Sequence, residues 1–172
     1  MDWPRVKLLA MDVDGTLTDG RIYVGRDGEA MKAFDVHDGY AIAHMLPKMK
    51  IVPVVITGRN SHIVNRRCDE LGIEHVYQGV TSKIEQLESV CRVERVSLSQ
   101  VAYIGDDMND LDCMQAVNRA GGLTACPANA CGDVLDIATF VSTKDGGFGS
   151  VREFVEAISA DSANWENRGN CG

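Results

Sequence analysis

Several features that mark particular classes of protein are scarce in this sequence. Its 17 Lys and Arg residues are outnumbered by 25 Asp and Glu residues, which leaves a net charge of −8. This shortage of basic residues argues against non-specific nucleic-acid binding and against a basic membrane-surface role. No apolar run approaches the ~18 residues that a membrane-spanning helix requires. A phosphorylated ligand is still compatible with the charge, because a metal ion and a few local bases can reverse the sign of one pocket.

The cysteines lack the pattern of a metal site or of a disulfide framework. There are six, and no two form a C-x-x-C pair. The four histidines do not lie near them at ligand spacing, which disfavours zinc. Because no secretory signal peptide is recognisable, we expect reduced thiols and a cytoplasmic protein.

The length of 172 residues fits one domain with at most a small insertion. We expect this domain to cover residues 1–160. The composition turns polar after Ala160, so residues 161–172 are predicted to form a frayed tail. We see no internal repeat and no low-complexity segment.

Apolar runs alternate with helical patterns along the chain, which predicts an α/β fold around a parallel sheet. The predicted strands are 6–11, 51–57, 75–77, 101–104, 122–126 and 139–142. The predicted helices are 37–50, 61–71, 82–93, 109–116, 130–135 and 151–158, with Thr81 or Ser82 capping the third. Residues 19–35 read as a β-hairpin insertion, with 21–24 against 29–34. Pro47 disturbs the end of its helix, and Pro53 requires an early or edge position in its strand.

Three polar clusters fall where predicted strands end. They follow Met11, Ile56 and Ile104, and they contain Asp12 and Asp14, Thr57-Gly58-Arg59, and Gly105-Asp106-Asp107. Ligands bind at the carboxyl ends of strands in parallel sheets, so we expect these clusters to converge.

Asp12 and Asp14 are the strongest indication of chemistry. A single Asp after a strand is more often a turn residue, but two close carboxylates repel each other unless a proton or a cation intervenes. Magnesium suits such a site, because it binds one or two carboxylates together with substrate phosphate. Asp106 and Asp107, followed by Asp110, add acid at a second strand end; the structural alternative is a solvated acidic turn.

Thr57 and Lys83 supply groups that can bind a phosphate. A hydroxyl at the end of a strand can donate to a phosphate oxygen, and a lysine at a helix start adds positive charge where the helix N-terminus already favours anions. Either residue alone is weak evidence for a phosphate site, because a lysine that begins a helix is usually just exposed.

The motifs DVDGTLT, ITGR, a lysine near a helix start and GDDMND occur in the order and spacing of the haloacid dehalogenase superfamily of phosphatases, which this chain resembles over residues 7–158. The resemblance implies a Rossmann-like fold. It also implies that Asp12 is the nucleophile that forms an aspartyl-phosphate and that Asp14 is the general acid and base. Thr57 and Lys83 would hold the phosphoryl group. A receiver domain does not fit, because its acid pair comes early and its phosphorylated Asp lies mid-chain.

The same resemblance implies a magnesium site. Asp106 would bind the ion together with Asp12 and the backbone carbonyl of Asp14. Asp107 or Asp110 would not bind the ion directly but would support the residues that do.

Further segments, including KAFDVHDGYAI, VYQGVTSK and GGFGSVREF, resemble the capless, tetrameric phosphatases of eight- and nine-carbon sugar acids. In such enzymes a neighbouring subunit covers the active site. The candidates for substrate contact are Arg59, Gly58, Lys32, His37 and Asp38. Arg59 could pair with a sugar carboxylate, or be a surface or interface arginine. His37 could instead cap its helix.

Within this group, Thr57-Gly58-Arg59 resembles the phosphatases of 3-deoxy-D-manno-octulosonate (KDO) 8-phosphate, which implies that substrate. His37 and Ala41 depart from the commoner FxxRDGxG pattern, and CPANAC is similar to domains fused to CMP-sialate synthetases. A phosphatase of KDN or N-acylneuraminate 9-phosphate and a non-catalytic oligomerisation domain therefore remain alternatives.

Overall fold

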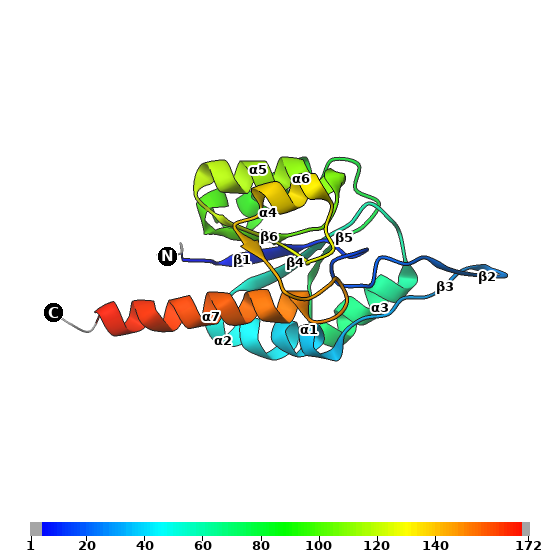
Figure 1. Ribbon diagram of the computed structural model, residues 1–172, viewed down its shortest axis with the longest axis horizontal. Coiled ribbons are helices and arrows are strands. Elements are labelled where there is room, and N and C mark those ends of the chain that lie inside the picture. Colours follow the sequence, from blue (N-terminus) through cyan, green and yellow to red (C-terminus); the bar gives the residue numbers. More distant parts are fainter. Residues whose placement is uncertain (1–4, 170–172) are drawn as a thin grey trace.

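A six-stranded parallel sheet forms the centre of the molecule (Figure 1). The computed structural model describes residues 5–169, and the side chains of residues 5–160. The strand order is β5-β4-β1-β6-β7-β8, and the predicted α/β class is confirmed. The sheet consists of β1 (Leu8–Met11), β4 (Val52–Ile56), β5 (His75–Tyr77), β6 (Val101–Ile104), β7 (Leu123–Cys126) and β8 (Phe140–Val141).

Helices cover both faces of this sheet, with α1, α2, α3 and α7 on one side and α4, α5 and α6 on the other (Figure 1). Leu9 and Met11 of β1 pack into the first layer, and Leu8 and Ala10 into the second. Burial on both faces explains why β1 reads as one continuous apolar run. The helices are α1 (Val36–Tyr40), α2 (Leu46–Met49), α3 (His62–Leu71), α4 (Lys83–Glu94), α5 (Leu111–Ala120), α6 (Gly132–Ile137) and α7 (Ser150–Gly169), with 3-10 turns at Leu98–Gln100 and Met108–Asp110.

Local side chains set several of the helix boundaries. The hydroxyl of Ser82 accepts the Glu85 N–H at the start of α4, which confirms one of the two predicted caps. Ser61 plays the same role for α3, which ends at Gly72 in the left-handed conformation (φ 70°).

The predicted helix 37–50 is not one regular helix. A π-helical turn, Ala41–Met45, separates α1 from α2. Pro47 lies in the first turn of α2, which directly follows these helical residues. The wider π turn lets the chain accommodate a residue that cannot donate to the preceding turn. Pro53 is the second residue of β4, an early position as expected.

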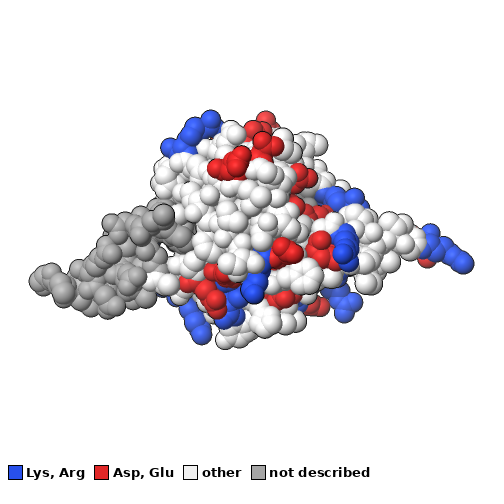
Figure 2. All heavy atoms as spheres, viewed as in Figure 1, with Lys and Arg blue, Asp and Glu red and all other residues white. Residues whose placement is uncertain are grey.

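The insertion is a two-stranded hairpin, β2 (Tyr23–Gly25) and β3 (Gly28–Met31), which projects from one end of the molecule (Figure 1). Acidic and basic side chains are interspersed on the face shown in Figure 2. Among the described residues, five cysteines are free thiols and no helix has the length and apolarity needed to cross a bilayer. Helix α7 continues past Ala160 to Gly169. Residues 170–172 lie outside the described residues, and the predicted fraying of residues 161–172 stays a prediction.

Candidate active site

Adjacent strands bring the predicted polar clusters to one edge of the sheet. β1 lies between β4 and β6, with Met11 opposite both Val55 and Ile104. Asp12 follows directly, and its N–H donates to the Ile104 carbonyl at 3.0 Å. Thr57, one residue beyond β4, is buried at the same edge. Strand pairing therefore positions Asp12 at the middle of the edge where parallel sheets bind ligands.

A buried lysine joins two carboxylates at this edge. The Nζ of Lys83 lies 2.8 Å from Oδ1 of Asp12 and 2.8 Å from Oδ1 of Asp110. Lys83 is the first residue of α4, and it is only 5% exposed. It is therefore not the solvated lysine usual at a helix start; it supplies the positive charge that lets two acids lie close together.

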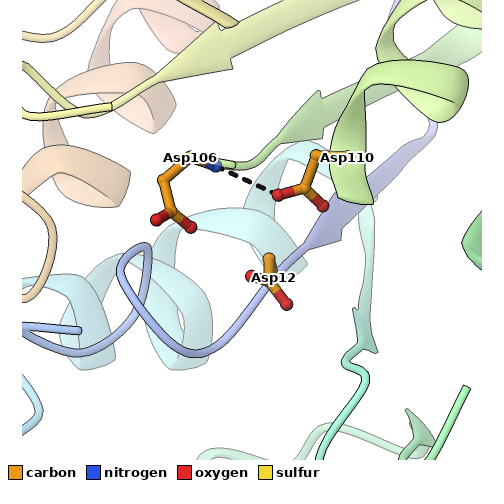
Figure 3. Close-up of side chains that lie close together, drawn as sticks. All are labelled: Asp12, Asp106 and Asp110. Carbon is orange, nitrogen blue, oxygen red and sulfur yellow. Dashed lines mark hydrogen bonds between the residues drawn. The ribbon is translucent and has the colours of Figure 1, made fainter. Parts of the chain in front are cut away.

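Asp110 is fully buried, and it lies close to Asp12 and Asp106 (Figure 3). Its Oδ1 accepts from Lys83 and from the Tyr103 hydroxyl at 2.6 Å, and its Oδ2 accepts the N–H groups of Asp106 and Asp107 at 3.1 and 3.4 Å. An ionised carboxylate offers about four lone-pair sites. Since these contacts use them all, Asp110 anchors Lys83 and the turn after β6.

Tyr103 is a residue of the site that sequence reasoning missed. It is fully buried within β6, and its hydroxyl donates to Asp110. A buried tyrosine hydroxyl as a rule has a partner. The available signal was one hydroxyl in the otherwise aliphatic run Val101–Ile104.

The turn after β6 packs directly on the loop after β1. The Thr16 hydroxyl donates to Oδ1 of Asp106 at 3.1 Å. Gly15 has a φ of 95°, and a Cβ there would lie 2.1 Å from Oδ2 of Asp106. Only glycine permits this approach, so the DVDGT and GDD segments interlock.

Burial and neighbouring carboxylates raise the pKa values of two of these acids, Asp12 and Asp106. Burial, with the charge of Asp110, raises the pKa of Asp12 to about 6 despite the nearby lysine. Burial, with the charge of Asp12, raises the pKa of Asp106 to about 7. Burial alone would lower the pKa of Lys83, but Asp12 and Asp110 outweigh it and the pKa is raised. One lysine thus faces three acids.

This excess of negative charge fits a cation site. Oxygens of Asp12, Asp106 and Asp110 all lie within 4.8 Å of one another. Because Asp110 is saturated, Asp12 and Asp106 are the side chains that could hold an ion, and hard carboxylate oxygens suit magnesium. Asp107 does not join this cluster: it is exposed, and its carboxylate accepts the Met108 N–H at 2.8 Å.

Asp14 belongs to a second cluster of charges that involves the hairpin. Its carboxylate pairs with Lys32, which also lies 3.0 Å from Glu29, and Oδ2 is 3.8 Å from Nε of Arg59. The Lys32 side chain is 1% exposed and that of Arg59 53%. Glu29, also missed from the sequence, accepts from the Ser61 hydroxyl. The cluster thereby ties β3 and the start of α3 to the loop after β1.

The other three predicted substrate contacts, Gly58, His37 and Asp38, belong to neither of these two clusters. Gly58 is exposed beside Arg59. His37 is also exposed. It does not cap its helix, because Asp35 is the cap of α1 and accepts the His37 N–H, while the ring nitrogen also contacts the Asp35 carboxylate. Asp38 departs from its predicted role because it is buried, and its Oδ1 accepts the Arg152 N–H of α7 at 2.7 Å.

The site thus consists of a lysine-bound aspartate at the end of a central strand, facing a second acidic turn. Residues 57–154, more than half of the chain, match the family model of haloacid dehalogenase-like hydrolases. The chain belongs to this family, and the resemblance described from its motifs is confirmed.

The chain is also similar to individual phosphatases of this family. The chain is 39% identical over 153 residues to the 3-deoxy-D-manno-octulosonate 8-phosphate phosphatase KdsC of Escherichia coli K12, across 89% of this chain and 79% of that one. It is similar to the solved phosphatase of the same name from Moraxella catarrhalis, in complex with a magnesium ion, a phosphate ion and KDO, with 39% identity, a TM-score of 0.85, and 94% and 90% of the two chains covered. The cobalt-bound Haemophilus influenzae phosphatase has 34% identity and a TM-score of 0.86, with 92% and 90% covered.

Proposed function

We propose that this chain is a magnesium-dependent phosphatase that hydrolyses KDO 8-phosphate. The observation that carries the proposal is the buried Asp12, bound by Lys83 and close to Asp106, in a chain that shares 39% identity with the KdsC phosphatases over most of its length. The Moraxella complex with magnesium, phosphate and KDO supports both the metal and the substrate.

In the proposed reaction an Asp12 oxygen attacks phosphorus, and the bond from phosphorus to the sugar oxygen breaks. Asp14 gives its proton to that leaving oxygen, which departs as the sugar alcohol. Asp14 then takes a proton from water as the water oxygen attacks the aspartyl-phosphate. This step releases inorganic phosphate and regenerates both acids.

Charge neutralisation is the main demand on the site, because an anionic ester repels a carboxylate nucleophile. Lys83 is fixed by Asp110 at hydrogen-bond distance from Asp12, so its charge is preorganised where the equatorial oxygens would lie. A magnesium ion held by Asp12 and Asp106 would add further neutralisation of the phosphoryl oxygens. Thr57, at the end of β4, is the proposed hydroxyl donor.

Arg59 and Lys32 are the proposed contacts for the sugar carboxylate. Arg59 is half-exposed and only loosely paired with Asp14 at 3.8 Å, so its guanidinium is available for a second anion. A planar fork matches a carboxylate with two hydrogen bonds. Lys32 is buried between Asp14 and Glu29, and it brings the hairpin to the same place.

A homotetramer with active sites near subunit interfaces is part of the proposal. It is supported by exposed apolar side chains in the hairpin insertion and on α1, namely Ile22, Val24, Met31, Val36 and Tyr40. Exposed apolar side chains that gather on a surface commonly mark protein interfaces. Light scattering coupled to gel filtration would test it; a monomer at micromolar concentration would contradict it.

The test of function is phosphate release from KDO 8-phosphate, KDN 9-phosphate and N-acetylneuraminate 9-phosphate, with magnesium or with EDTA. We expect KDO 8-phosphate to give the highest kcat/KM and EDTA to abolish turnover. Asp12→Asn should be inactive, and activity in that variant would refute the nucleophile. Arg59→Ala should raise KM for KDO 8-phosphate but not for p-nitrophenyl phosphate, which has no carboxylate; equal effects would remove the carboxylate contact.

A further inference from the structure

Asp38 is a buried acid that the proposed mechanism does not use. It is 2% exposed, and burial raises its pKa to about 6. Its Oδ1 accepts the Arg152 N–H at 2.7 Å, whereas Oδ2 is buried with no hydrogen-bond partner among the described residues. Burying a carboxylate is costly unless its contacts compensate for the lost hydration. Its contact with the start of α7 is therefore the place to look for its role.

The start of α7 has no side chain of its own that caps it. The first amides of a helix lack intrahelical acceptors, which an N-cap oxygen normally supplies. Gly149, directly before α7, has a φ of 97° and no side chain, and Oγ of Ser150 is buried without a partner in the described part of the chain. Asp38 of α1, which packs beside α7 (Figure 1), supplies the missing acceptor, and its charge suits the positive end of this 20-residue helix.

The turn that leads into α7 rests on the loop after β1. The Gly147 N–H donates to the Thr16 carbonyl at 3.1 Å. A Cβ on Gly146 would lie 1.7 Å from the Gly15 carbonyl oxygen, so the two backbones are in direct contact. Gly15 in turn is packed against the Asp106 carboxylate. The 146–149 turn thus presses the 15–18 loop against the acidic turn after β6.

We propose that Asp38 is a positioning residue for the phosphatase reaction. By capping α7 from outside that helix, it holds the 146–149 turn against the 15–18 loop and keeps Asp14 and Asp106 in their catalytic arrangement. The inference rests on the proposed function of the site. Removal of the acceptor frees the first turn of α7, and the effect falls mainly on kcat because small displacements of reacting groups are costly.

The test compares Asp38→Ala, which removes the acceptor, with Asp38→Asn, which retains one of similar shape. We expect Asp38→Ala to lower kcat roughly tenfold and Asp38→Asn to stay within about threefold of the parent, the scale of losing and keeping one helix cap. Val90→Ala, a core truncation in the opposite helix layer, is the control for lost stability. Hydrogen exchange of the 15–18 and 146–149 amides, measured without substrate, should speed up in Asp38→Ala and not in the control.

Unchanged exchange in these two segments, or equal losses of kcat in Asp38→Ala and Val90→Ala, would overturn the positioning role. If Asp38→Ala does not fold, Asp38→Ser replaces it, because the shorter serine side chain moves the acceptor away from α7. The same comparison of kcat and of hydrogen exchange with Val90→Ala then tests the positioning role. A parent protein that releases no phosphate would refute the proposed function instead, and the exchange experiment would still test the contact between turn and loop.

Discussion

Protons and magnesium should compete for the same two carboxylates. In the metal-free protein burial and the charge of Asp110 raise the pKa of Asp12 to about 6, and burial with the charges of Asp12 and Asp110 raises that of Asp106 to about 7. Both groups must be ionised to hold a cation, so lowering the pH from 8 to 6 should weaken magnesium binding. The sign follows from the raised values, because unperturbed aspartates would be ionised throughout this range.

The magnitude can be worked from those two values. At pH 6 about one in eleven Asp106 carboxyls and about half of the Asp12 carboxyls are ionised, which leaves roughly one molecule in twenty ready to bind. At pH 8 about nine in ten are ready. The dissociation constant for magnesium should therefore rise roughly 20-fold from pH 8 to pH 6, with more than about one proton released per ion bound at pH 6.

Titration calorimetry without substrate measures both quantities, because runs in two buffers of different ionisation enthalpy give the number of protons released. Asp112→Asn is a matched control, since it removes one exposed acid next to the site and should leave the pH dependence intact. A dissociation constant that changes less than about threefold between pH 8 and pH 6, with no proton release, would refute the raised pKa values and the assignment of these ligands.

Further substitutions test the buried network and its neighbours. Lys83→Met leaves two buried carboxylates without a counter-charge, so we expect a loss of about 3–5 kcal/mol in metal-free unfolding free energy and no turnover, with magnesium restoring part of the stability; a wild-type melting curve would contradict this. Tyr103→Phe removes one donor from the buried Asp110 and should cost about 1–2 kcal/mol by denaturant unfolding. Tyr23→Phe on the hairpin removes a hydroxyl that donates to the partly exposed Asp19, and it should cost less. Gly146→Ala places a Cβ against the Gly15 carbonyl and should lower kcat at least about tenfold; normal turnover would show that the turn does not constrain the loop.

Local patterns were sufficient for most of the fold. The apolar runs at β1, β4 and β6 predicted strands buried on both faces, and each is a strand of the parallel sheet. Ser82 was recognisable as a cap because its hydroxyl acts within three residues. The π-helical turn before Pro47 was not predictable in form, since proline excludes a regular turn without specifying its replacement.

The residues of the site were predictable from the sequence only where their local sequence context indicates their role. Asp12, Lys83 and Asp106 stand at recognisable strand and helix ends, and the structure brings them together. Asp38, beside His37 in a polar segment, looked like a substrate contact, yet it accepts from a backbone amide 114 positions away. Such a pairing leaves no local pattern.

The sequence alone determined the family, the succession of strands and helices along the chain, and the identity of the acids, because these depend on short motifs and local periodicity. Tertiary structure decided which acid is saturated by donors, which lysine is buried between carboxylates, and which glycines allow two loops to pack in direct contact. Asp110 shows the reason most clearly. Its four donors come from Lys83 on α4, from Tyr103 on β6 and from two turn amides, and only folding brings these groups within hydrogen-bond distance of one carboxylate.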